Sequence, residues 1–68
     1  MNVKDIASKL VSEFGEIAFK DCMSSIEGGI RQEPGSKGYE CELKLNELLE
    51  DHNQEDVAIG KLIEIANP

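Results

Sequence analysis

The sequence predicts a small all-α domain that resembles a four-helix bundle and spans residues 1–68. Three observations support this fold class. Apolar residues recur at helical spacing in four segments, two of the three breaks between them are short, and the third break, residues 28–38, is longer and rich in glycine. A chain of this length buries only roughly 60 % of its unfolded surface, so we expect all four helices to share one core.

The first two helices are predicted from the clearest periodicity in the chain. Residues 3–14 carry apolar side chains at i, i+3, i+4, i+7, i+8 and i+11, with Asn2 as a candidate N-cap. Gly15 supplies a stop, and a second apolar stripe follows over residues 16–27. One glycine between two helices implies a sharp corner, so both stripes should face the same core.

Residues 28–38 are predicted to be a loop. They contain four of the six glycines and Pro34. The glycines show neither the G-x-G-x-x-G spacing nor the P-loop spacing that binds phosphate, so we interpret the stretch as a flexible connector or the tip of a hairpin.

Residues 39–52 fit two patterns. As a helix they place Cys41, Leu45 and Leu49 on one face, whereas as a strand they alternate apolar and charged residues from Tyr39. Glu, Leu and Lys are good helix formers, and an isolated two-stranded hairpin is marginal in water, so we favour the helix. The alternative is an α+β fold with a β-hairpin at about residues 29–45.

The fourth helix is predicted over residues 54–66, with Asn53 as its N-cap. Gly60 lies in its middle, where glycine costs about 1 kcal/mol relative to alanine, and we interpret it as a close helix crossing. The side chains expected in the core of the four helices are those of Leu10, Phe14, Phe19, Met23 and Ile63.

The formal net charge is −7, and most of it belongs to residues 39–68, which hold eight acidic and two basic residues. Nucleic-acid binding depends on Lys and Arg neutralising phosphates, and anionic lipid attracts the same residues. We therefore expect no direct nucleic-acid binding and no membrane binding. A basic protein surface is the partner that this charge favours.

No residue pattern indicates catalysis, a cofactor or a metal site, and the chain is not expected to be an enzyme. His52 is the single histidine, and we interpret it as a half-buried residue at a helix end. Asp51, Asn53 and Glu55 imitate the start of a calcium loop, which then lacks its glycine and its bidentate glutamate. Cys22 and Cys41 show no paired motif, so we expect buried thiols in a cytoplasmic protein.

The predicted function is protein binding, of the adaptor, inhibitor or nucleic-acid-mimic kind, through an acidic surface in residues 40–56. An exposed leucine within a row of carboxylates is a candidate anchor for a pocket on the partner. The candidate partner-binding residues are Glu40, Leu43, Glu47, Glu50, Asp51 and Glu55. The alternative is a structural module that self-associates as a homodimer through leftover apolar residues such as Ile17, Leu43 and Ile65.

Overall fold

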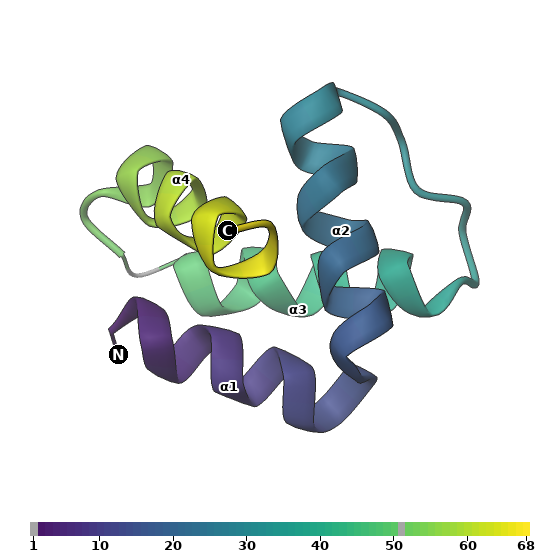
Figure 1. The fold of residues 1–68 in the computed structure, drawn as a ribbon, viewed down its shortest axis with the longest axis horizontal. Coiled ribbons are helices and arrows are strands. Elements are labelled where there is room, and N and C mark those ends of the chain that lie inside the picture. The colour runs from purple at the N-terminus through teal and green to yellow at the C-terminus, as the bar shows by residue number, and fades with distance from the viewer. Residues whose placement is uncertain (1, 51) are drawn as a thin grey trace.

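The computed structural model describes residues 2–50 and 52–68 and folds them into four α-helices. These are α1 (Val3–Phe14), α2 (Glu16–Gly28), α3 (Lys37–Leu49) and α4 (Glu55–Ala66) (Figure 1). The described residues form no strand, so the all-α prediction is confirmed. The alternative with a β-hairpin at 29–45 is wrong, because residues 37–45 belong to a helix.

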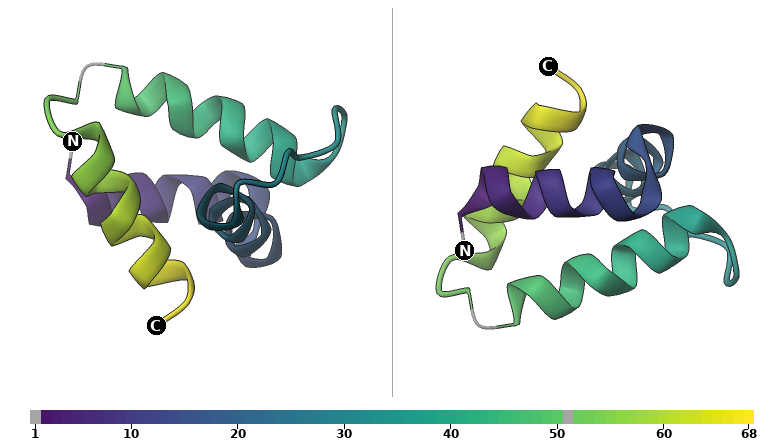
Figure 2. Two further views of the ribbon diagram at one scale, coloured as in Figure 1. Left: turned by 90° about the horizontal axis from the view of Figure 1, so that it is seen from above. Right: turned by 90° about the horizontal axis from the view of Figure 1, so that it is seen from below.

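The helices are arranged around a steep corner. Figures 1 and 2 show α1 and α3 running side by side in opposite directions, with α2 standing across their ends and α4 lying over α1. α2 packs against the other three helices, whereas α3 and α4 have the least contact with each other. The fold is therefore centred on the α1–α2 pair.

Short polar side chains cap two of the helices. The Asp5 N–H donates to Asn2 Oδ1 at 2.9 Å, as the sequence predicted for the start of α1. The Tyr39 N–H donates to Ser36 Oγ at 3.1 Å, so Ser36 caps α3. The helix therefore begins at Lys37, two residues before the predicted start at residue 39. The prediction of Asn53 as the cap of α4 is wrong, since Gln54 occupies the N-cap and makes no side-chain bond there.

All four helices contribute to one apolar core. Leu10, Phe19 and Met23 are buried as predicted, and none of the polar or charged side chains that the structure describes is buried with them. Phe14 and Ile63 were expected in the core but are only half-buried at its edge. The buried residues of the shared core are Ile6, Ala7, Leu10, Phe19, Cys22, Met23, Cys41, Leu45, Leu49, Ala58, Leu62 and Ala66.

Gly60 does not mark a helix crossing. It is exposed, and a Cβ built on it would meet no described atom within 4 Å outside its own helix. The close approach occurs instead at the buried Gly38, where a Cβ would lie 2.7 Å from Gln32 Oε1. A side chain at this position would therefore displace the Gln32 amide from its place against the start of α3.

Gln32 connects the loop to α2. Its side-chain amide donates to the backbone oxygen of Asp21 at 3.0 Å and to Ser25 Oγ at 2.7 Å. Because the same side chain lies against Gly38, it bridges α2 and the first turn of α3. The loop is held to the helices at this point, in contrast to the flexible connector that composition alone suggested.

Leu10→Ala should lower the free energy of unfolding by about 2–5 kcal/mol, because Leu10 is fully buried among residues of the other helices. Val11→Ala, at the exposed neighbouring position, is the matched control and should cost less than about 1 kcal/mol. Denaturant unfolding followed by circular dichroism measures both. Equal losses in the two variants would show that Leu10 does not belong to the core.

Gln32→Ala should cost about 1–2 kcal/mol, since it removes two hydrogen bonds to α2. Gln54→Ala, which removes a side chain without a capping bond, should stay within about 0.5 kcal/mol of wild type. Gly38→Ala should be less harmful in the Gln32→Ala background than in wild type, because the clashing amide is absent there. Additive effects in the double variant would contradict this contact.

Candidate functional site

The structure places the described partner-binding residues along α3, in the turn that follows it and at the start of α4. Glu40, Leu43 and Glu47 lie on α3, within reach of the end of α1. Glu50 follows α3 as its C-cap and Glu55 begins α4, so these two carboxylates lie near the turn between the helices. Asp51 lies outside the described residues. The acidic surface predicted over residues 40–56 stays a prediction, and its first part is the one that meets α1.

A shallow hollow between α1 and α3 collects the first group. It measures about 390 Å³ and is lined by residues of both helices. Leu43, 46 % exposed, lies in it together with the half-buried Phe14. The charged side chains of this α1/α3 hollow are Glu13, Glu40, Lys44 and Glu47.

Negative charge prevails in the α1/α3 hollow. Lys44 Nζ lies 3.7 Å from Glu47 Oε1, a loose ion pair one helical turn apart. Neither Glu13 nor Glu40 forms an ion pair with any residue that the structure describes. Three carboxylates therefore surround an exposed leucine, and one lysine compensates only part of their charge.

Sequence reasoning missed Glu13 and Phe14. Both are separated by more than twenty residues from α3, and periodicity within α1 does not reveal which helix will lie beside its last turn. The available signal was Phe14, the final member of the apolar stripe of α1, since a residue at the end of a stripe often borders the core.

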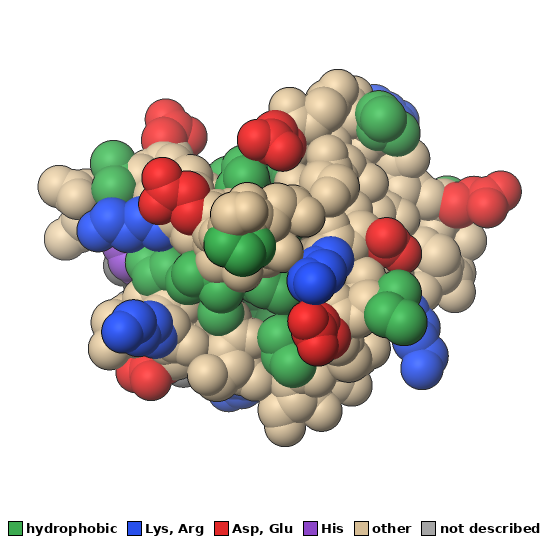
Figure 3. Space-filling model, viewed as in Figure 1, with side chains coloured by type: hydrophobic (Ala, Val, Ile, Leu, Met, Phe, Trp, Pro, Cys, Tyr) green, Lys and Arg blue, Asp and Glu red, His purple; other side chains and the backbone are tan. Residues whose placement is uncertain are grey.

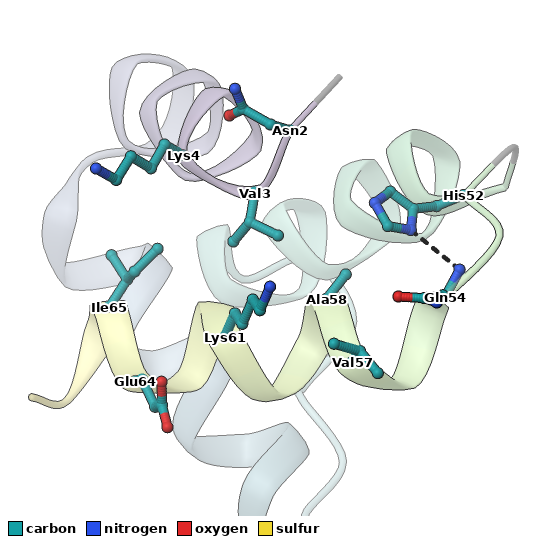
Figure 4. Close-up of a pocket in the computed structure, with 10 residues that line it drawn as sticks. All are labelled: Asn2, Val3, Lys4, His52, Gln54, Val57, Ala58, Lys61, Glu64 and Ile65. Carbon is teal, nitrogen blue, oxygen red and sulfur yellow. Dashed lines mark hydrogen bonds between the residues drawn. The ribbon is translucent and has the colours of Figure 1, made fainter.

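A larger groove lies between α1 and α4, with a volume of about 690 Å³. Apolar side chains gather in the hollow between these helices in Figure 3. Figure 4 shows Val3 directed from α1 toward α4, while Ala58, Lys61 and Ile65 are directed from α4 toward α1. Val57 and Ile65 of α4, which also line the groove, are 50 % and 43 % exposed.

His52 belongs to the edge of the same groove and not to a helix. α3 ends at Leu49, so the prediction of a histidine at the end of this helix is wrong by three residues. The half-buried imidazole accepts a hydrogen bond at Nδ1 from the Gln54 N–H at 3.3 Å, which positions the turn before α4 (Figure 4).

The two cysteines meet inside the core, both as free, fully buried thiols. The hydrogen bond with Cys41, together with burial, raises the pKa of Cys22 well above its usual range. A thiolate is therefore disfavoured at Cys22, and solvent has no direct access to either sulfur. The pair contributes apolar packing between α2 and α3.

Within residues 2–50 and 52–68, no group of three or more Cys, His, Asp and Glu side chains is arranged to hold a metal ion. None of the helices in the same ranges combines the length and the apolar character that crossing a membrane requires. Comparison of the chain with protein-family models, curated proteins and solved structures gave no match.

The buried thiols give a prediction. In native buffer at about pH 8, Ellman's reagent should react with Cys22 and Cys41 only at the rate at which the protein unfolds locally. In about 6 M guanidinium chloride both thiols should react at once. The Leu10→Ala variant should react faster because its core opens more often. One thiol reacting immediately in the native wild type would contradict the burial of the pair.

Proposed function

We propose that this protein is a non-catalytic binding module that docks on a basic protein surface through the α1/α3 hollow. The observation that carries the proposal is the convergence of carboxylates from two helices around an exposed leucine. Glu13 comes from α1, Glu40 and Glu47 come from α3, and Leu43 lies among them. The cytoplasm is the proposed compartment, with which the free thiols agree.

The two kinds of side chain have different roles in such docking. Exposed carboxylates steer a basic partner and speed association, while each contributes only about 0.2–1 kcal/mol to affinity. Leu43 and the half-buried Phe14 supply the apolar contact whose burial slows dissociation. A partner that fits this surface presents Lys or Arg around an apolar pocket.

Self-association, the alternative, has weaker support as the main function. Ile17, Leu43 and Ile65 are all exposed, but they line three different hollows. A symmetric dimer that buries all three would need one continuous face. A homodimer stays a prediction, and salt distinguishes the two ideas, because carboxylate docking weakens with ionic strength whereas apolar association holds or tightens.

Reversing Glu13, Glu40 and Glu47 together to Lys should slow association with the basic partner at least about tenfold at low salt and leave the fold intact. All three side chains are exposed and outside the core. Wild-type bait first captures the partner from a lysate of the source, and purified partner is then measured by stopped-flow or biolayer interferometry across ionic strengths.

The matched control reverses Asp21, Glu27 and Glu33, three exposed carboxylates outside the α1/α3 hollow, and produces the same net charge. The control should associate much faster than the Glu13/Glu40/Glu47 variant. Leu43→Ala should leave the association rate nearly unchanged and speed dissociation. If both triple variants associate equally slowly, net charge and not this hollow governs binding, and the proposal fails.

A further inference from the structure

The groove between α1 and α4 combines exposed apolar side chains with two lysines. Val57, Lys61 and Ile65 are spaced four residues apart and form the wall of the groove on α4. The lysine lies between two exposed β-branched side chains. Val3 and Lys4 form the opposite wall on α1. Each of the two walls of the groove thus carries apolar side chains and one lysine.

The lysines of the groove have no carboxylate partner in the described part of the chain. Lys20 and Lys44 form ion pairs with Glu16 and Glu47, whereas Lys4 and Lys61, like the other cations of the described chain, form none. Glu64 also borders the groove, but Figure 4 shows its side chain directed away from α1. What distinguishes Lys4 and Lys61 is their position, because both line the groove beside exposed apolar side chains.

We infer that the α1/α4 groove binds a short amphipathic, acidic segment of a protein partner. Apolar side chains of the segment pack on Val3, Val57 and Ile65, and its carboxylates reach Lys4 and Lys61. Recognition of an amphipathic helix in an apolar groove uses anchors at i, i+3 or i+4, and i+7. From Val57 to Ile65 the wall of α4 extends about 12 Å, which matches two turns of such a helix.

Charge selects this occupant over the others. A second copy of the chain brings a net charge of −7 against −7, and this repulsion is larger than the one that a short segment with a few carboxylates meets. A basic segment would be repelled by Lys4 and Lys61. A nucleic acid would contact only these two cations and would cover apolar side chains that its phosphates cannot use. An acidic segment with apolar anchors satisfies both features of the groove. The site is separate from the α1/α3 hollow, so it stands or falls independently of the function proposed above.

The experiment titrates the ¹⁵N-labelled full chain with two probe peptides, each about 12 residues long and capped at both ends. The acidic peptide has Leu at i, i+3, i+4 and i+7 and Glu and Ala elsewhere, and the basic peptide has Lys in place of each Glu. We expect the acidic peptide to shift the amide resonances of Val3, Lys4, Val57, Lys61 and Ile65 in a saturable way. The basic peptide should leave these five resonances unshifted.

Two charge-reversal variants test the role of the lysines. Lys4→Glu with Lys61→Glu should weaken binding of the acidic peptide by about tenfold or more. The control variant, Lys9→Glu with Lys37→Glu, makes the same change of net charge at exposed positions outside the groove. It should weaken binding of the acidic peptide by less than about threefold. Dispersed amide spectra show that each variant is folded.

Four outcomes would overturn the inference. These are no saturable shift at millimolar acidic peptide, equal binding of the basic peptide, shifts confined to residues outside the groove, and equal losses in the two variant pairs. Concentration-dependent shifts of the same groove amides without any peptide would show that a second copy occupies the groove, and would overturn it as well.

Discussion

Gly15 is the single residue between α1 and α2, and the arrangement of the other helices depends on it. Its φ of 93° lies in the region that side chains disfavour. Its N–H donates to the Val11 oxygen at 2.8 Å, and its own oxygen accepts from the Phe19 N–H at 3.1 Å. The same residue thus ends one helix and begins the next, and α2 must turn steeply across the end of α1.

The corner explains where the hollows lie. Once α2 crosses the end of α1, α3 and α4 cover the two remaining sides of the pair and have little contact with each other. α1 therefore forms a wall of both hollows, with Glu13 and Phe14 near its end facing α3 and Val3 and Lys4 near its start bordering α4. Both hollows therefore result from the way α3 and α4 pack on the corner formed by α1 and α2.

The helices themselves were predictable because periodicity is a local property. The apolar stripe, Asn2 and Gly15 predicted α1 with both of its ends, and α2 extends one residue beyond its predicted end. For residues 39–45 the alternation of a strand and the stripe of a helix overlapped. The Ser36 cap and packing of Cys41, Leu45 and Leu49 against the other helices decide for the helix, at the cost of leaving Leu43 exposed. Composition alone did not reveal how Gln32 holds the loop.

The candidate sites were less predictable, because they depend on which helices become neighbours. The sequence identified Glu40, Leu43 and Glu47, but not Glu13, and it missed the α1/α4 groove entirely. Helix stability does not account for the charges at these places. Glu13 and Glu47 lie in the last turns of α1 and α3, and Lys4 lies in the first turn of α1, where the helix dipole disfavours each by about 0.3–1 kcal/mol. Charges that oppose the dipole and lie beside exposed apolar side chains agree with the docking roles that we propose for the two places.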